Sequence, residues 1–333
     1  MLSTRNCQLL DACDKLLVGG KPMSKILVIG SLNLDMVTNV DHMPAVGETI
    51  LCPSMQLIPG GKGANQACAA ASLGADTTIL GAVGADSYAE LLKESLCRAG
   101  ADVSHLIVRP DQNTGVALIT VNRDGDNSIV VVSGANAAIH PEDIEKNRPL
   151  LEACDMVVLQ MEIPLETVLY SARLAKQLGK TVLLDPAPVP KVFPEELLQY
   201  VDILKPNETE LSMLTGIDIT DKDTGESHLE EAAAWVHRHG CPHLVVTLGE
   251  KGVYLHSDVD STQKNCRIPA RKVHAVDTTA AGDTFTAALA VRLLEGASLK
   301  DAALFANCAS SIVVTRKGAQ SSIPTREEVR EIF

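Results

Sequence analysis

Residues 156–184 read MVVLQMEIPLETVLYSARLAKQLGKTVLL, with two short apolar runs on either side of a helical pattern. The runs are Met156–Leu159 and Thr181–Leu184. Between them, apolar residues recur at spacings of three and four, which predicts an amphipathic helix ending at Gly179. A strand, a helix and a second strand in this order form the crossover unit of a parallel sheet.

The same alternation extends in both directions along the chain. Further helical patterns cover Ser87–Ala99 and the segment before Gly240. Further apolar, strand-like runs lie at Ile26–Ile29, Thr77–Leu80, Ile203–Leu204 and Leu244–Leu248. Apolar strands that alternate with amphipathic helices are buried on both faces. The sequence therefore predicts an α/β fold with a doubly wound, mostly parallel sheet.

Two stretches break this rhythm. Residues 36–58 and 115–132 have β-forming character and turn signals, but no helical pattern. In the second stretch, Asp124-Gly125 separates two apolar runs, which predicts a hairpin. Such strands do not fit a parallel core, so we expect a small β-sheet that forms a lid over a site at the carboxyl ends of the strands.

The composition is that of an acidic, globular chain. It has 333 residues, with 29 Lys and Arg against 42 Asp and Glu, for a formal net charge of -13. This length provides one large domain or two ordinary ones and a sizeable core. The negative charge argues against a nucleic acid or an anionic membrane as a partner, but not against a local phosphate site.

Cysteine usage and hydropathy predict a cytoplasmic protein. The nine cysteines are scattered and never spaced C-x-x-C, as expected of reduced thiols. No apolar run approaches the roughly 18 residues of a membrane span. Near the N-terminus, Asp11, Asp14 and Lys15 interrupt the apolar residues that a signal peptide needs. We expect residues 1–24 to be a disordered extension.

Three weaker signals point elsewhere and are rejected. Gly179-Lys180-Thr181 resembles the end of a P-loop, but residue 174 is Leu where that motif needs Gly. The glycines at 60–63 come about 30 residues after the first strand, too late for a dinucleotide-binding turn. His237, His239, Cys241 and His243 are clustered, but the neighbouring Gly and Pro favour a solvated helix end over a metal site.

Two glycine-containing motifs carry the chemistry. Residues 60–65 read GGKGAN and residues 277–283 read DTTAAGD, and each opens a helical segment. Glycines before a helix let a ligand approach the backbone, and the amides of a helix start attract anions. A capping role accounts for one aspartate, but not for both Asp277 and Asp283 around a loop of small residues. We expect an anion site there.

Together these motifs resemble the two signatures of the PfkB carbohydrate kinase family. Further matching segments follow in the expected order: GSLNLD at 30–35, QME at 160–162, DPAP at 185–188, PNETE at 206–210, TLGEKG at 247–252 and TRKGAQ at 315–320. The resemblance begins near Lys25. It implies one α/β domain of residues 25–333, with lid strands inserted from about 36–58 and 115–132.

The segments are most similar to those of members that transfer the ATP γ-phosphoryl group to the 5-hydroxyl of D-ribose. The alternatives are another sugar or nucleoside kinase, such as one acting on deoxyribose, or a sugar-binding protein without catalysis. By resemblance, Asp283 is the base that accepts the hydroxyl proton. The amides of Ala280, Ala281 and Gly282 then hold the developing phosphoryl charge.

On the sugar side, Asp35 can accept two hydroxyl hydrogen bonds at once, which suits a vicinal diol. Asn33 favours ribose over 2-deoxyribose, because a site built to bind a hydroxyl rejects the analogue that lacks it. Ala117 and Ile119, on one lid strand, are expected to cover the sugar. The resemblance implies substrate contacts from Asn33, Asp35, Gly61, Lys62, Asn65, Glu162 and Asp283.

The resemblance also implies ATP, Mg²⁺ and an activating K⁺. Glu210 matches the residue that organises Mg²⁺ through water, as suits an ion that keeps its hydration shell. The K⁺ positions are Asp277, Thr279, Val313, Arg316, Gly318 and Ser322, mostly through backbone carbonyls. The ATP positions are Asn207, Thr247, Leu248, Gly249, Glu250, Lys251, Gly252, Gly282, Asp283 and Asn307.

Members with such a lid often dimerise through it. An isolated small sheet leaves its edges and one apolar face exposed, and a second copy can cover them. We therefore expect a homodimer that joins through the lid.

Overall fold

The computed structural model describes residues 24–220, 225–259 and 265–333, and its main sheet has eight strands. Neighbouring strands from β4 to β12 are parallel, whereas β13 and β14 add two antiparallel pairings at one edge. In spatial order the strands are β14 (Cys266–Ile268), β13 (Val253–Ser257), β12 (His243–Thr247), β11 (Ile203–Leu204), β10 (Thr181–Leu184), β9 (Met156–Leu159), β1 (Lys25–Ile29) and β4 (Asp76–Leu80).

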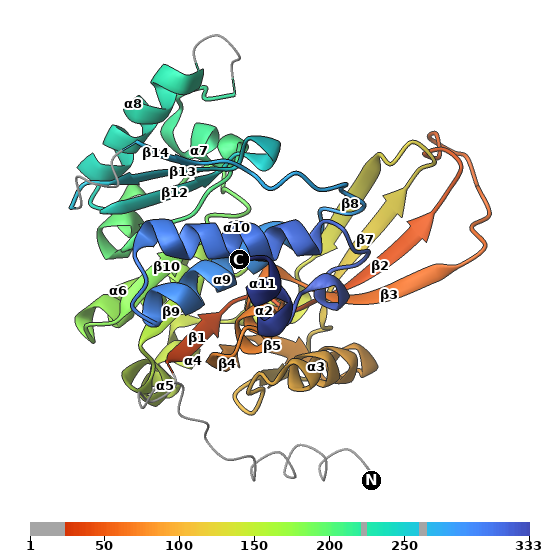
Figure 1. The fold of residues 1–333 in the computed structure, drawn as a ribbon. Helices are drawn as coiled ribbons and strands as arrows, with labels where there is room; N and C mark the ends of the chain where they lie inside the picture. The colour runs from red at the N-terminus through yellow and green to blue at the C-terminus, as the bar shows by residue number, and fades with distance from the viewer. Residues whose placement is uncertain (1–23, 221–224, 260–264) are drawn as a thin grey trace.

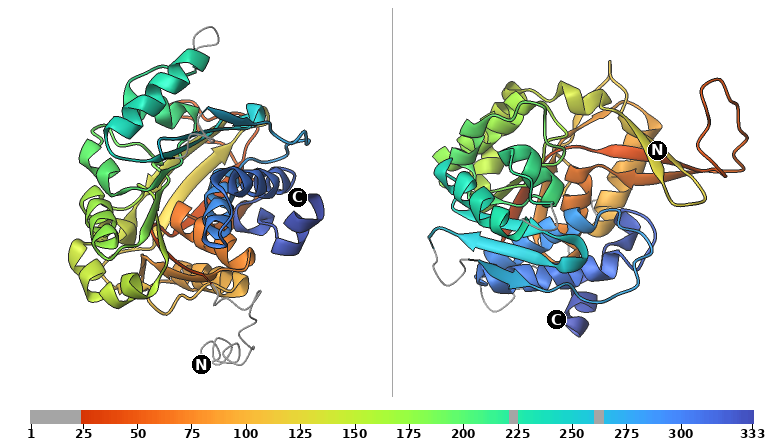
Figure 2. Two further views of the ribbon diagram at one scale, coloured as in Figure 1. Left: turned by 60° about the vertical axis from the view of Figure 1, so that its left-hand side comes forward. Right: turned by 90° about the horizontal axis from the view of Figure 1, so that it is seen from above.

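Helices cover both faces of this sheet, as Figures 1 and 2 show. Alternate residues of β1 point to opposite faces, so Ile26 and Val28 join one apolar core while Leu27 and Ile29 join the other. The first core is completed by α2 (Lys62–Ser72), α3 (Ser87–Ala99), α9 (Ala281–Leu294), α10 (Leu299–Val313) and α11 (Arg326–Ile332). The second is completed by α4 (Pro141–Lys146), α5 (Arg148–Ala153), α6 (Leu165–Gln177), α7 (Glu208–Thr215) and α8 (Gly225–Arg238).

A second sheet of four strands projects from one end of this body (Figure 1). Strand β2 starts soon after β1 ends, and β3 leads directly into α2, so the small sheet is attached to the carboxyl edge of the main one. Its strands, in spatial order, are β3 (Met55–Gly60), β2 (Asn33–Asn39), β7 (Gly115–Val121) and β8 (Asn127–Val132). The β2–β7 pairing is parallel and the other two are antiparallel.

Short elements complete the described fold. Strands β5 (Ala82–Gly84) and β6 (Ile107–Arg109) form a two-stranded parallel sheet. The 3₁₀ helices are η1 (Gly134–Ala138), η2 (Glu195–Tyr200), η3 (Gly249–Lys251) and η5 (Gln320–Ser322).

The predicted α/β fold with its mostly parallel sheet is confirmed, as is the hairpin of β7 and β8. The predicted helix end near Gly240 is also confirmed, since α8 ends at Arg238 and the His237 ring bonds the Cys241 carbonyl. In the first predicted β-rich stretch, residues 36–58, strands occupy only the two ends, and residues 40–54 between them form no regular element. The expected extension, residues 1–24, lies outside the described residues except for Ser24.

Within the described ranges, the structure has no helix long and apolar enough to cross a bilayer.

Candidate active site

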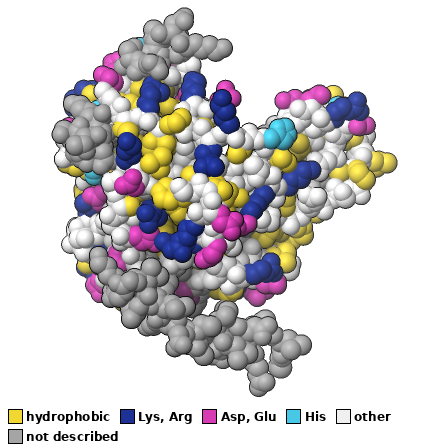
Figure 3. All heavy atoms as spheres, viewed as in Figure 1, with side chains coloured by type: hydrophobic (Ala, Val, Ile, Leu, Met, Phe, Trp, Pro, Cys, Tyr) yellow, Lys and Arg dark blue, Asp and Glu magenta, His cyan; other side chains and the backbone are white. Residues whose placement is uncertain are grey.

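The candidate site lies where the parallel strands end. Three polar residues, Gln160, Asp185 and Lys205, directly follow β9, β10 and β11, and all three are buried. The carboxyl ends of parallel strands are the usual place for a ligand in such sheets. Figure 3 shows the surface hollowed between the main body and the small sheet that projects from this edge.

Asp283 brings the two sequence motifs together. It is the third residue of α9 and only 7% exposed. Its Oδ2 accepts a hydrogen bond from Asn65 Nδ2 at 2.9 Å, and its Oδ1 accepts one from Gln66 Nε2 at 3.2 Å. Residues more than two hundred positions apart therefore meet at one carboxylate, as the sequence predicts for a shared site.

The start of α9 is open, without a capping side chain. Ala280 occupies the cap position in the left-handed region, at φ 60°, and no side chain bonds the first-turn amides. The Ala281 amide donates to the Thr278 carbonyl at 3.2 Å, so this predicted anion donor is already occupied. The first amides of a helix have no intrahelical acceptor, which leaves those of Gly282 and Asp283 for an anion.

The predicted sugar residue Asn33 is held by a residue that the sequence analysis missed. Asn136, buried in η1, donates to Asn33 Oδ1 at 2.8 Å. It also accepts from the Leu32 amide and donates to the Leu32 carbonyl. These bonds fix the orientation of the Asn33 amide. No motif surrounds Asn136, and only the fold brings it to β2.

Glycines at the end of β3 bring the backbone close to this side of the site. A Cβ atom on Gly60 would lie 2.5 Å from Asp35 Oδ2, and one on Gly61 would lie 2.6 Å from the Asn33 backbone nitrogen. Gly61 also has φ 87°, which a larger residue rarely adopts. The turn therefore requires both glycines in order to hold Asp35 and Asn33 beside α2.

Charged groups are concentrated at the same place. Burial, together with the negative charges of Glu162 and Asp283, raises the pKa of Asp35 to about 7. Burial acts to lower the pKa of Lys62, but Asp283, Asp185 and other nearby carboxylates raise it overall. Glu162 Oε2 accepts hydrogen bonds from Ser31 Oγ and from the Lys62 amide. The site thus has a Lys62 ammonium group among several carboxylates.

The predicted nucleotide residues gather around the ends of β11 and β12. Asn207 caps α7: its side chain accepts from the Glu210 amide, and Glu210 Oε2 accepts from the Asn207 amide, both at 2.8 Å. Thr247 lies beside Asn207 in an isolated parallel bridge. Residues 248–252 follow in the η3 turn, and a Cβ atom on Gly252 would lie 2.0 Å from the Ile268 carbonyl oxygen.

Asn307 reaches this region from α10. Its Nδ2 donates to the Pro269 carbonyl at 2.8 Å, next to the strand against which Gly252 packs. The structure therefore brings these predicted positions together near the ends of β11 and β12 and the start of β14.

The predicted K⁺ positions lie in the loop before α9 and in the segment that begins at Val313, the last residue of α10, and ends at Ser322 in η5. Asp277 joins the two. Its Oδ1 accepts from the amide and hydroxyl of Thr279, and its Oδ2 accepts from the Gly318 amide at 2.9 Å. Burial opposes ionisation of Asp277, but these hydrogen bonds lower its pKa overall. Arg316 is instead paired with Glu328, and the buried Ser322 hydroxyl donates to the Ala319 carbonyl.

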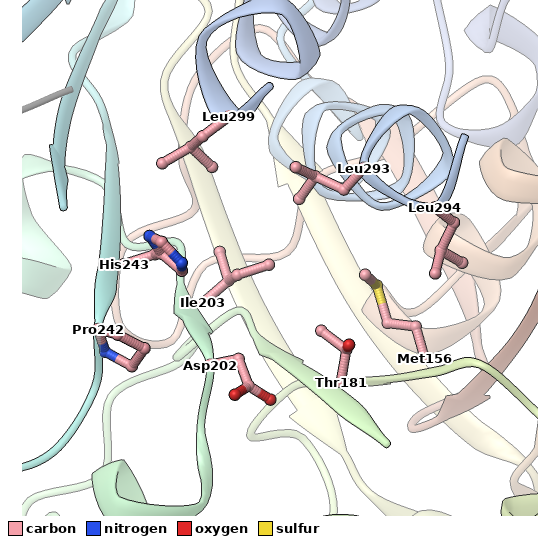
Figure 4. A pocket seen from close by; sticks show the side chains of 9 residues that line it. All are labelled: Met156, Thr181, Asp202, Ile203, Pro242, His243, Leu293, Leu294 and Leu299. Atoms are coloured by element: carbon pink, nitrogen blue, oxygen red, sulfur yellow. The ribbon is translucent and has the colours of Figure 1, made fainter. Parts of the chain in front are cut away.

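A cavity of about 360 Å³ lies at the opposite edge of the main sheet (Figure 4). It is lined by Met156, Thr181, Asp202, Ile203, Pro242, His243, Leu293, Leu294 and Leu299. Several of these residues begin β9, β10, β11 and β12, so the cavity is at the amino edge. It contains none of the predicted site residues.

Comparison with known proteins places this geometry in a family. The model of the pfkB family carbohydrate kinases matches residues 23–326. The chain belongs to the PfkB family of carbohydrate kinases. The match covers nearly all of the described domain and includes both glycine-containing motifs.

Curated relatives include ribokinases and a deoxyribokinase. A ribokinase from Haemophilus influenzae is 40% identical over 308 residues, which are 92% of this chain and 98% of the relative. A deoxyribokinase from Salmonella typhi is 38% identical over 311 residues, 92% of this chain and 97% of the relative. Each of these two alignments covers 92% of this chain.

Solved structures agree with the fold. A structure of Arabidopsis thaliana ribokinase complexed with ribose and ATP superposes with a TM-score of 0.87 at 35% identity, covering 93% of this chain and 98% of that one. Thermotoga maritima ribokinase gives a TM-score of 0.82 at 39% identity, covering 93% of this chain and 98% of that one. The ribokinase-like α/β fold is thereby confirmed.

Proposed function

We propose that this protein transfers the γ-phosphoryl group of ATP to the 5-hydroxyl of D-ribose, forming D-ribose 5-phosphate and ADP. The observation that carries the proposal is the Asp283 carboxylate at the open start of α9, hydrogen-bonded to Asn65 from the sugar-side motif. Ribokinases at about 40% identity support the same reaction.

In this mechanism the chain positions two reactants and stabilises charge. Asp283 accepts the hydroxyl proton, and the amides of Gly282 and Asp283 bind the transferring phosphoryl oxygens. The Ala280 amide joins them, and so does the Ala281 amide once it releases the Thr278 carbonyl. Lys62 adds positive charge beside them. In-line placement of hydroxyl and phosphoryl group supplies much of the rate, because phosphoryl transfer needs little covalent assistance.

On the sugar side, one observation points directly to a ligand. Asn65 Oδ1 is buried and has no hydrogen-bond partner among the described residues. A sugar hydroxyl would satisfy this acceptor, whereas an unsatisfied buried acceptor costs stability. We assign ribose binding to Asn33, Asp35, Gly61, Lys62, Asn65 and Glu162, with Ala117 and Ile119 as apolar cover.

The nucleotide positions also fit a cation held through water. Glu210 is half-buried, and one of its carboxylate oxygens is already engaged by the Asn207 amide. No group of three His, Cys, Asp or Glu residues in the described ranges could hold a metal directly. Mg²⁺ keeps several waters and needs only one or two carboxylates, so Glu210 is adequate for an ion that neutralises ATP phosphates. We assign ATP binding to Asn207, Thr247, residues 248–252, Gly282, Asp283 and Asn307.

The Asp277 loops fit an activating K⁺ next to the start of α9. Asp277 accepts hydrogen bonds at both of its oxygens and still has lone pairs for a cation. We assign K⁺ binding to Asp277 together with backbone carbonyls of Thr279, Val313, Arg316, Gly318 and Ser322. Replacing K⁺ by a large organic cation is expected to lower activity. Equal activity in both cations would contradict this assignment.

In this proposal the small sheet is a lid on a single domain of residues 25–333, and two lids join to form a homodimer. Residues 129–132 of the edge strand β8 are about half exposed, and Figure 3 shows hydrophobic side chains on this projecting part. An exposed apolar edge strand favours pairing with another chain. Size-exclusion chromatography with light scattering is expected to give twice the mass of the chain.

We also propose a cytoplasmic location. The support is chemical, because exposed Cys52 and the buried Cys68, Cys154, Cys241 and Cys308 are free thiols.

The deciding experiment is a coupled assay of ADP release with ribose, 2-deoxyribose, fructose and adenosine, each with and without K⁺. We expect the highest kcat/KM for ribose, because the fixed Asn33 amide is placed to bind a hydroxyl. A deoxyribokinase is the second candidate, since a relative with that name is 38% identical. A higher kcat/KM for 2-deoxyribose would favour it.

A further inference from the structure

Gln66 is a buried glutamine whose amide joins two carboxylates. It follows Asn65 in α2 and has no exposed surface. Its Nε2 donates to Asp185 Oδ2 at 2.9 Å and to Asp283 Oδ1 at 3.2 Å. Its Oε1 accepts from Gln160 Nε2 at 2.6 Å. Both amide protons are therefore used by carboxylate oxygens.

This pattern allows only one orientation of the Gln66 amide. Rotating it by 180° would place Oε1 against the two carboxylates and Nε2 against the Gln160 amide protons. Neither contact can form a hydrogen bond, because acceptors would face acceptors and donors would face donors. Gln66 is thus a fixed donor to Asp283.

The other end of this connection is a buried ion pair. Lys205 Nζ lies 3.1 Å from Asp185 Oδ2, and the two side chains are 4% and 2% exposed. Lys205 Nζ also donates to the Gly282 carbonyl at 3.4 Å. The Thr286 hydroxyl lies 3.0 Å from that carbonyl and 3.3 Å from Asp185 Oδ2. The ends of β10 and β11 are thereby tied to the first turn of α9.

We propose that Gln66 is a positioning residue for Asp283, fixed in turn by Gln160 and by the Asp185–Lys205 ion pair. This inference rests on the proposed function, because it takes Asp283 as the catalytic base. With Asn65 on Oδ2 and Gln66 on Oδ1, both carboxylate oxygens are held by donors from α2. The carboxylate plane is then set before the sugar arrives, and lone pairs remain for the hydroxyl proton.

Gln66 also separates two like charges. Asp185 and Asp283 share its amide protons, so its loss would leave two carboxylates beside each other without their common donor. The charged groups around Asp283 are Lys62 from α2, Asp185 and Lys205 from the strand ends, and Asp35 from β2. None of the other groups donates a hydrogen bond to Asp283 Oδ1 in the described residues.

The test is a double-mutant cycle with Gln66→Met and Asp283→Asn, read with radiolabelled ATP so that slow variants are measurable. Methionine keeps the shape of the side chain but donates nothing. We expect Gln66→Met to lower kcat about 10²-fold, the scale of a misplaced catalytic group, while KM for sugar and ATP changes by less than about threefold. In the Asp283→Asn background the same change should cost less than about twofold, because it acts through Asp283.

Thr167→Val is the matched control. Thr167 lies in α6, outside the site, and is also fully buried. Its hydroxyl donates to the Ile139 carbonyl at 2.8 Å. The control is expected to lose stability without loss of kcat. If Gln66→Met fails to fold, Gln66→Glu keeps both shape and polarity and is expected to lose kcat at least as strongly, because it adds a third carboxyl group.

The outcomes separate this inference from the proposed function. A kcat for folded Gln66→Met or Gln66→Glu within twofold of wild type would overturn the inference alone. So would an equal loss in both backgrounds, which indicates a merely structural role. If wild type prefers another sugar, ribose is the wrong substrate, and the cycle run with that sugar still decides the role of Gln66. Wild-type turnover by Asp283→Asn would remove both.

Discussion

Helices α9 and α10 pack side by side in opposite directions, yet their first turns are completed differently (Figure 1). At α10, the Ser298 hydroxyl accepts from the Asp301 amide at 3.1 Å. At α9, Ala280 provides no such acceptor. The capped start lies at the amino edge of the sheet, beside the cavity of Figure 4, and the uncapped start lies at the carboxyl edge.

This difference indicates what each helix start does. A capping side chain typically stabilises a helix by about 1 kcal/mol, so omitting it has a cost. At α9 the omission leaves first-turn amides free beside Asp283 and Lys62, where an anion can bind. At α10 the cap satisfies one first-turn amide, that of Asp301, from within the chain. The start of α9 therefore lacks the stabilisation of a capping side chain and has amides available for an anion.

The largest effect is expected from Asp283→Asn. Removing the proton acceptor should lower kcat by ~10²–10⁴, the usual range for a general base. Ribose affinity should change little, because the proposed sugar contacts of Asn33, Asp35 and Glu162 remain. Steady-state kinetics with calorimetric binding of ribose measures both quantities. A variant that loses ribose binding in proportion to kcat would make Asp283 a binding residue only.

A pH effect of about tenfold is expected from Asp35. Its pKa is raised to about 7, so the carboxylate is mostly ionised at pH 8 and mostly protonated at pH 6. Only the ionised form accepts two sugar hydroxyls, so KM for ribose should rise about tenfold from pH 8 to pH 6. The increase should disappear in Asp35→Asn. A constant KM in wild type across this range would contradict the role of Asp35.

The smallest effect is expected from Ala280→Gly. Alanine at φ 60° is disfavoured, whereas glycine adopts this conformation readily. The free energy of unfolding should rise by up to about 1 kcal/mol, offset in part by the greater freedom of glycine in the unfolded chain. Denaturant unfolding measures it. A clear loss of stability would show that the left-handed start of α9 carries no strain.

The sequence was sufficient for the architecture and for the two motifs. Buried parallel strands are apolar throughout, so β9, β10 and β11 can be read directly, and the Asp124-Gly125 turn identifies the β7–β8 hairpin. The antiparallel strands β13 and β14 were not predicted. Val253–Ser257 has no flanking helix to mark it, and Cys266–Ile268 is too short to stand out.

Within the site, the sequence could identify residues but not their partners. Asn136 donates a hydrogen bond to Asn33 from about a hundred residues away, and no local sequence pattern predicts that contact. Gln66 is adjacent to the first motif, yet its role depends on Asp185 and Asp283 meeting in space. Occupation of the Ala281 amide by Thr278 likewise depends on the loop conformation. Such contacts are properties of the fold.

The most direct test places a carboxylate at the second residue of α9 and, in a separate variant, at the second residue of α10. Gly282→Asp and Lys300→Asp both put a carboxylate where a helix start favours it, worth about 0.3–1 kcal/mol. The space around Gly282 is open, with only Lys205 Nζ within 4 Å of an added Cβ atom. The account predicts that kcat falls ~10²–10³ in Gly282→Asp, because the carboxylate occupies the phosphoryl site. It predicts a kcat within about twofold of wild type in Lys300→Asp, and equal kcat losses in the two variants would contradict it.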